Sequence, residues 1–328
     1  MELQIEAFFF DANKDYLPYY KKFNINIDKE EPITNILPLI KEQSAEFNYN
    51  PTKEYFRVNS KIVGADIKVE EVVDRFGQEL KIEPLLEYRA NSSLLIDDSN
   101  FYKNLEPLKP FCNKEDLEFY ESLYPIFFGS ETFYFNKNYI GDSVIILAEH
   151  LINKDNSKEE EILEIITQED GLWDGEYENN MFKDIDYSQT FESLKKRASN
   201  PPKNRVSSLF ARSYKEVPLL DEYGVGVYGS YQFENRVREL GFNTISYEAR
   251  EKKCGISLLD TNEKMALLKA GRVLSSAFDN GADILVVEDS KVLKYFKDNI
   301  GKIEKVLNRE LPLNLYSLSD LQKLKEAA

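Results

Sequence analysis

The chain is poor in the side chains that most often bind metals or carry out covalent chemistry. Its 328 residues include two cysteines, one histidine and one tryptophan. Two cysteines provide no disulfide framework and are typical of a protein in a reducing compartment. A single histidine leaves imidazole-based metal sites and histidine relays with too few groups. Disulfide-rich secreted proteins and histidine-based metalloenzymes are therefore disfavoured.

Long apolar runs and excess positive charge are also missing. No apolar run approaches the roughly 20 residues of a membrane span, and residues 1–5 lack the basic and apolar regions of a signal peptide. We therefore expect a cytoplasmic protein without direct membrane insertion. The 42 Lys and Arg against 58 Asp and Glu give a net charge of −16. That charge repels phosphate backbones and disfavours nucleic acid as a partner.

What is present indicates a folded protein of several domains. Hydrophobic residues make up 42% of the chain and aromatic residues 13%, which is typical of folded proteins. Residues 200–204 read Asn-Pro-Pro-Lys-Asn, and adjacent prolines rule out a continuing helix. A second boundary lies near residue 107. We predict domains at 1–107, 108–200 and 213–328, with a linker at 201–212.

The first domain has the pattern of a small β-grasp-like sheet. Alternation predicts strands at 3–10 and 21–27, which the turn residues 11–15 join as a hairpin. Helical spacing follows at 32–43, where Pro38 should end or kink the first turns. A further strand at 55–59 precedes a turn at Ser60 and Lys61.

The other two domains differ in pattern. Residues 108–200 look all-helical, with helices at 116–124 (capped by Asn113), 141–152, 156–166 and 187–198. From 213 on, strands alternate with helices, which predicts a parallel α/β sheet. The predicted strands are 224–229, 244–247, 283–287 and 313–317, and the helices 232–240, 261–280, 290–299 and a terminal helix capped by Ser319. The fold class is thus α+β multidomain.

Residues 1–200 resemble the iron–sulphur subunit of succinate dehydrogenase and fumarate reductase. Several segments carry the resemblance, among them Arg57-Val-Asn-Ser-Lys61, Tyr139-Ile-Gly-Asp-Ser, and Asp170-Gly-Leu-Trp173. They follow that family's order of R-V-N-G-K, Y-L-G-P-A and D-G-L-W. The resemblance implies a ferredoxin-like β-grasp domain for 2Fe–2S, then a helical ferredoxin-like domain for 4Fe–4S and 3Fe–4S.

The resemblance also implies that the cluster ligands are missing. The 2Fe–2S positions fall on Glu46, Pro51, Glu54 and Asp66, and those of the other two clusters on Ser122, Pro125, Gly129, Gly175 and Met181. None of these is a cysteine. Carboxylates are hard ligands that suit Mg²⁺ or Ca²⁺. The three acidic residues could hold such an ion or form a solvated acidic loop, and we favour the loop.

Residues 213–328 resemble the cysteine-rich (CCG) domain of heterodisulfide reductase. The similar segments are Tyr228-Gly-Ser230, Lys253-Cys-Gly255 and Gly281-Ala-Asp-Ile-Leu-Val286. The resemblance places Ser230, Lys253, Asp289 and Val292 at that domain's cysteine positions, so Cys254 is the one former ligand still in place. We therefore expect no cofactor and no metal.

Three further features of the sequence are candidate sites. Gly224, Gly226 and Gly229 match G-x-G-x-x-G formally, but they lie within a predicted strand, which disfavours dinucleotide binding. His150 is interpreted as an ordinary helix residue. Cys254, beside two lysines, is the one weak catalytic candidate, with an inert leftover thiol as the favoured alternative.

The leading hypothesis is a cluster-free paralogue that works by interaction and not as an electron carrier. Its partner would be a flavoprotein or another protein of a respiratory complex, through which it associates with the inner face of the membrane. The alternative is a small-molecule or anion-binding module in residues 213–328, at strand ends and helix N-termini. A weaker alternative is a thiol-dependent enzyme or redox sensor that uses Cys254.

Overall fold

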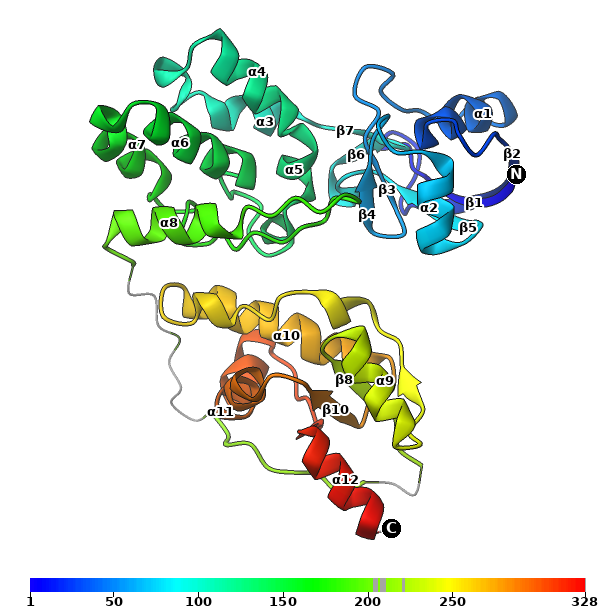
Figure 1. The fold of residues 1–328 in the computed structure, drawn as a ribbon, viewed down its shortest axis with the longest axis vertical. Coiled ribbons are helices and arrows are strands. Elements are labelled where there is room, and N and C mark those ends of the chain that lie inside the picture. Colours follow the sequence, from blue (N-terminus) through cyan, green and yellow to red (C-terminus); the bar gives the residue numbers. More distant parts are fainter. Residues whose placement is uncertain (203–205, 207–210, 220–221, 328) are drawn as a thin grey trace. The chain divides into compact units, whose positions relative to one another are not determined.

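The computed structural model describes residues 1–202, 206, 211–219 and 222–327. The chain divides into two compact units, which we call the first unit (1–133 with 138–198) and the second unit (134–137 with 199–328). The described residues form twelve α-helices and several β-sheets, of which one is wholly parallel (Figure 1). The prediction of a mixed α/β protein with a parallel sheet is confirmed.

A five-stranded sheet opens the first unit. Its strands are β1 (Glu2–Phe9), β2 (Tyr19–Asn26), β3 (Phe56–Val58), β4 (Lys61–Val63) and β5 (Glu79–Glu83). They lie in the order β2-β1-β5-β3-β4, with β1 and β5 parallel and the other neighbours antiparallel. The predicted hairpin is β1 and β2, which pair along their whole length from Glu2–Asn26 to Phe9–Tyr19.

Alternation sets which face of this sheet is buried. Leu3, Ile5 and Ala7 of β1 point into a core shared with the helices α1 (Ile36–Gln43) and α2 (Val69–Phe76). Pro38 lies in the first turn of α1, where its missing N–H breaks no helical bond. A short 3₁₀ turn precedes α1. We call the opposite side of the sheet the outer face.

The turn between β3 and β4 lies one residue earlier than predicted. Its two residues are Asn59 and Ser60, with φ of 45° and 73°. Two consecutive left-handed residues form the tight hairpin turn that matches the twist of paired strands. Asn59 also extends the ladder with its side chain, since its Oδ1 accepts from the Lys81 N–H at 2.8 Å.

The rest of the first unit is mainly helical. A two-stranded ribbon, β6 (Ala90–Ser92) and β7 (Leu95–Ile96), leads into it. The helices are α3 (Ser99–Leu105), α4 (Lys114–Ser122), α5 (Tyr124–Gly129), α6 (Asp142–Lys154), α7 (Glu159–Ile166) and α8 (Ser188–Ala198). Asn113 caps α4 as predicted, its side chain accepting from the Asp116 N–H at 3.0 Å. These helices surround a second core, separate from that under the sheet.

Residues 180–182 join the two parts of the first unit. The Ile62 N–H of β4 donates to the Asn180 carbonyl at 2.8 Å, and the Phe182 N–H donates to the Ile62 carbonyl at 2.8 Å. The backbone at Met181 thus covers the outer edge of β4. The Ile62 side chain packs into the helical core. Both parts accordingly belong to one compact unit, although each has its own core.

The second unit is built on a four-stranded sheet, ordered β11-β10-β8-β9, in which every pair is parallel. Its strands are β8 (Val225–Tyr228), β9 (Thr244–Ile245), β10 (Ile284–Val287) and β11 (Asn314–Tyr316). Its helices are α9 (Tyr231–Glu239), α10 (Glu263–Asp279), α11 (Ser290–Leu307) and α12 (Leu318–Ala327). The predicted parallel arrangement of these strands is confirmed.

Two details of the predicted helices are wrong. The helix expected to end at Asn299 continues to Leu307, because Ile300 and Ile303 keep the apolar spacing. The terminal helix is capped by Ser317 and not by Ser319. The Ser317 hydroxyl accepts from the Asp320 N–H at 3.2 Å, and the Asp320 carboxylate accepts from the Ser317 N–H at 2.9 Å.

The described residues 211–219 are part of the second unit. The Arg212 guanidinium donates to both carboxylate oxygens of the nearly buried Glu304, at 2.6 and 2.8 Å. The side-chain amide of Asn314 exchanges two hydrogen bonds with the Val217 backbone, at 2.8 and 3.0 Å. The predicted linker 201–212 falls largely on residues 203–205 and 207–210, which lie outside the described residues.

Within the described ranges, no helix has both the length and the apolar character needed to cross a membrane.

Candidate functional site

The four positions that the resemblance assigns to 2Fe–2S ligands lie on loops, where lysines pair with two of them. Glu46 and Asp66 are exposed and accept from Lys21 and Lys183, each at 2.7 Å. The hydrogen bond from Lys21 holds the pKa of Glu46 below its ordinary value. The other two positions are the exposed Pro51 and the partly exposed Glu54. Across the described residues, no three His, Cys, Asp or Glu side chains are grouped to hold a metal ion.

The positions assigned to the other two clusters are mostly buried. Ser122 is exposed, and its hydroxyl donates to the Phe119 carbonyl at 2.6 Å. The others lie in or against the helical core: Pro125, Gly129, Gly175 and Met181. A Cβ at Gly129 would lie 2.7 Å from Ile62 Cδ1, and one at Gly175 only 2.4 Å from the Tyr139 hydroxyl. A side chain at Gly175 therefore requires the fully buried Tyr139 to move, whereas one at Gly129 requires the end of the Ile62 side chain to shift.

Aromatic rings fill the space around these positions. We call the group the aromatic cluster: Phe101, Tyr120, Tyr124, Phe127, Phe128, Phe133 and Tyr139. Phe127 is fully buried, with ring centroids 5.4 Å from Phe101 and 5.1 Å from Phe133. Tyr139 closes one end, and its hydroxyl donates to Asp142 at 2.9 Å. Such edge and offset contacts are those that aromatic side chains prefer.

The side chains at these positions do not fit iron–sulphur clusters. A cluster needs about four thiolates close together. Cys112 lies in the first unit and Cys254 in the second. Burial, with the nearby Asp116 carboxylate, raises the pKa of the Cys112 thiol to about 11, so it carries no thiolate at neutral pH. The available donor groups and the packing thus both argue against an iron–sulphur cluster at these positions.

A buried ionic cluster around Asp116 was not predicted from the sequence. The Asp116 carboxylate is almost fully buried and accepts from Lys154 at 2.8 Å, and its Oδ1 lies 3.0 Å from His150 Nε2. It also accepts from the Asn113 N–H at 2.8 Å. Burial alone would raise the pKa of Asp116, but these partners outweigh it and lower the pKa. The cluster connects α4 to α6. Its only sequence signal was that Asp116 is the acidic N3 residue of a capping box.

Carboxylates already accept hydrogen bonds from the N-termini of α9 and α11, where the strand order of the parallel sheet reverses. The strand order reverses between β8 and β10, which is where open α/β sheets bind ligands. There the Glu288 carboxylate accepts from the Ser230 N–H at 2.7 Å and from the Ser230 hydroxyl at 3.1 Å. Asp289 caps α11 by accepting from the Lys291 N–H at 2.7 Å. The role of Glu288 could not be predicted from the sequence because its partner Ser230 lies 58 residues away.

The glycines of the G-x-G-x-x-G match have packing roles. Gly224 directly precedes β8 and Gly226 lies within it, and a Cβ at Gly224 would lie 2.1 Å from the Gly281 carbonyl oxygen. A Cβ at Gly229 would lie 2.7 Å from Glu288 Cβ. The glycines thus let neighbouring backbone and the Glu288 side chain approach the strand.

The other three positions of the second unit that the resemblance assigns to cluster ligands differ in their burial. Cys254 is buried in an apolar core, where it packs among residues such as Tyr247 and Leu267. Lys253 beside it is exposed, and Val292 is buried on α11. Burial among apolar side chains is typical of structural cysteines.

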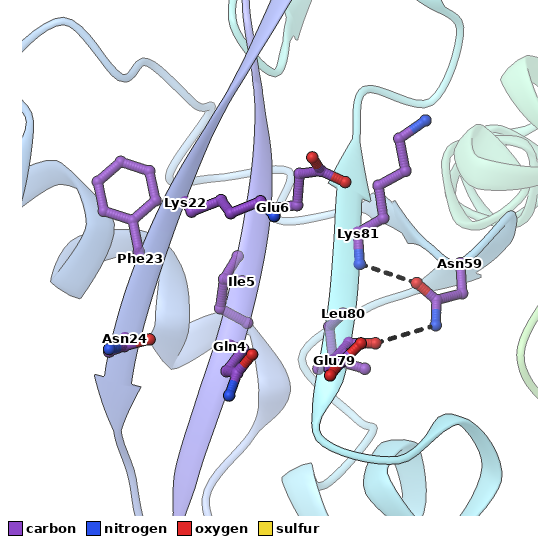
Figure 2. A pocket seen from close by; sticks show the side chains of 10 residues that line it. All are labelled: Gln4, Ile5, Glu6, Lys22, Phe23, Asn24, Asn59, Glu79, Leu80 and Lys81. Atoms are coloured by element: carbon purple, nitrogen blue, oxygen red, sulfur yellow. Dashed lines mark hydrogen bonds between the residues drawn. The ribbon is translucent and has the colours of Figure 1, made fainter.

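The outer face of the five-stranded sheet carries an open hollow of about 340 Å³ (Figure 2). It is lined by polar side chains of β1, β2 and β5, including Glu6, Lys22 and Lys81. At the other end of this face, Tyr20 donates to Glu83 at 2.6 Å. Burial and Glu83 raise the pKa of Tyr20 to about 12. The hollow holds both charge signs and no candidate nucleophile.

The chain matches no protein-family model and no curated protein. It is similar to the crystal structure of a hypothetical protein from Helicobacter pylori, with a TM-score of 0.49 and 18% sequence identity. That alignment covers 96% of this chain and 70% of that chain.

Proposed function

We propose that this protein is a cluster-free paralogue of a respiratory iron–sulphur subunit and works as a structural, regulatory or assembly partner. The observation that carries the proposal is the aromatic cluster and the two buried glycines beside it. Former ligand positions Gly129 and Gly175 abut packed side chains at 2.7 and 2.4 Å from a would-be Cβ. A chain that can hold no cluster has no means of carrying electrons by this route.

The order of the sheet supports the relationship. A β2-β1-β5-β3-β4 sheet with a parallel central pair, and α1 between β2 and β3, is the arrangement expected of a ferredoxin-like β-grasp domain. The helical part follows it directly, as in the resembling family. A protein with this fold but without clusters would act through its surface, which favours a protein partner such as a flavoprotein. That partner would hold the protein at the inner face of the membrane.

The test is affinity purification of the tagged full chain under anaerobic conditions. We expect a respiratory subunit to copurify, and the purified chain to be colourless and free of iron. Recovery of no respiratory subunit would refute the partner role. A brown, iron-containing chain would refute the cluster-free role.

A small-molecule site in the second unit is the second candidate, favoured by the reversal of strand order between β8 and β10. The carboxylates of Glu288 and Asp289 at that edge argue against an anion and for a neutral or cationic ligand. Thermal-shift screening of metabolites tests this, and uniformly flat curves would count against it. The thiol chemistry of Cys254 is the weakest candidate because the side chain is buried. Unchanged function in Cys254→Ser would remove it.

A further inference from the structure

The outer edge of β2 is an unpaired row of backbone hydrogen-bonding groups. Met1 and Ile27 exchange two hydrogen bonds, at 2.6 and 3.0 Å. Because bonded and non-bonded pairs alternate along an antiparallel ladder, the N–H and C=O groups of Tyr20, Lys22, Asn24 and Asn26 point away from β1. No other strand of the described chain pairs with this edge, and the Gln43 side chain reaches only the Asn24 carbonyl, at 3.4 Å.

A groove of about 750 Å³ lies at the Asn26 end of this edge, between β2 and α1. Its apolar side chains are Met1, Ile27, Pro38 and Leu39. On the other side of the same strand lies the hollow of Figure 2, to which Lys22 and Asn24 contribute. Alternate side chains of an added strand would point to the two faces, so each face of β2 offers them space.

The groove carries more negative than positive charge, because the one cationic group on its lining residues is the Met1 ammonium, which donates to the Ile27 carbonyl at 2.6 Å. Asp28, Glu31 and Glu42 line it, and no Lys or Arg among the described residues does. The nearby Lys68 pairs instead with Glu30, at 2.8 Å. An occupant that brings Lys or Arg to this end gains attraction. A second copy of this chain gains none, because each copy carries the same acidic groove and a net charge of −16.

We infer that β2 is the docking edge for an extended segment of a partner protein, which adds as a sixth strand. The segment has apolar residues at alternate positions against Ile27 and Leu39 and Lys or Arg beside Asp28, Glu31 and Glu42. Main-chain bonds to the edge supply affinity, and the groove selects the side chains. This inference rests on the proposed function, because it names the surface and the partner chemistry that an interaction role requires.

The test uses the full chain and a short synthetic peptide with a valine–threonine core and lysines at both ends. A matched peptide ends in glutamates instead. The key variant is Asn24→Pro, which removes one outward N–H and leaves the bonds to β1 intact, as proline is tolerated on edge strands. Asn24→Ala keeps the N–H and is its control. Glu42→Lys reverses one groove charge, and Glu160→Lys makes the same change on the exposed surface of α7.

We expect the lysine-ended peptide to bind and the glutamate-ended peptide to bind more weakly. Asn24→Pro should weaken binding at least about fivefold and Asn24→Ala should not. Glu42→Lys should weaken it about threefold and Glu160→Lys should not. Hydrogen exchange should show the Lys22 and Asn26 amides becoming protected in the complex, a readout that does not depend on any variant folding.

Several results would overturn the inference: no binding, equal binding of both peptides, equal loss in both Asn24 variants, or a dimer formed through β2. The two proposals fail separately. If a respiratory subunit copurifies equally well with Asn24→Pro, the docking edge is wrong and the partner role stands. If the peptide binds as expected but no respiratory subunit copurifies, the edge stands and the respiratory role falls.

Discussion

Alanine at Gly175 tests whether the aromatic cluster is as closed as the distances indicate. The new Cβ would lie 2.4 Å from the Tyr139 hydroxyl and 2.7 Å from Phe191 Cε1. Ordinary contact begins near 3.4 Å, so the hydroxyl must move by about 1 Å. Tyr139 is fully buried and bonded to Asp142 at 2.9 Å, so it cannot move without straining that bond.

The expected cost is the difference between two opposing terms. Overpacking a core costs about 1–3 kcal/mol. Replacing glycine at a backbone conformation that alanine accepts contributes about 0.4–1 kcal/mol of stability, and the φ of Gly175 lies outside the left-handed region. We expect Gly175→Ala to lower the free energy of unfolding by about 1–2 kcal/mol. For a unit of this size that lowers Tm by about 2–8 °C.

A double-mutant cycle with Tyr139→Phe identifies the cause. Removing the hydroxyl removes the 2.4 Å contact, so alanine at Gly175 should cost less in the Tyr139→Phe background than in the native chain. We expect a coupling free energy of about 1 kcal/mol, measured by chemical denaturation. If Gly175→Ala is neutral or stabilising, or if the two changes are additive, space remains at this position. The packing argument against a cluster would then be wrong.

Three other predictions concern interactions within the two units. Asp116→Asn should lower the free energy of unfolding by about 2–3 kcal/mol at neutral pH. Because folding lowers the pKa of Asp116, its contribution is present above the ordinary value of 3.8 and is lost as pH falls below it. Denaturation curves of native and variant chains should therefore begin to converge below about pH 4 and meet only below the lowered pKa of Asp116 in the folded chain. Ser317→Ala should cost about 1 kcal/mol and Ser319→Ala almost nothing, and equal effects in a melting experiment would contradict the assigned cap. Glu304→Gln should expose residues 211–219 to protease, since it weakens the bidentate bond to Arg212; unchanged cleavage would show that this bond does not hold the segment.

Local patterns in the sequence predicted most elements of the fold. Alternation at Leu3, Ile5 and Ala7 placed β1 correctly, and the Asn113 cap placed α4. One wrong prediction, the end of α11, involves a contact between residues far apart in the chain. The helix predicted to end at Asn299 continues through Gly301, where glycine is required because a Cβ would lie 2.1 Å from the Arg212 carbonyl oxygen. That contact joins residues 89 positions apart in the chain.

The candidate site was less predictable because its contacts are long-range. Nothing near Asp116 in the sequence indicates Lys154, and nothing near Ser230 indicates Glu288. The open edge of β2 could not be predicted either. Which of its N–H groups point outward depends on the pairing register with β1, and a shift by one residue would reverse them all.

The positions that the proposed ancestry assigns to cluster ligands have three different physical roles, and this matters for how that ancestry is tested. Glu46 and Asp66 form surface ion pairs, Gly129 and Gly175 admit packed side chains, and Ser230 caps a helix. Restoring cysteine would therefore act differently at each. At Gly129 the new side chain meets Ile62, whereas at Glu46 only an exposed ion pair with Lys21 is lost, which solvent screens. Cysteines at Glu46 and Asp66 should be tolerated, and those at Gly129 and Gly175 should destabilise the first unit. On the proposed ancestry, the buried ligand positions are therefore the ones at which packing makes a return to cysteine hardest.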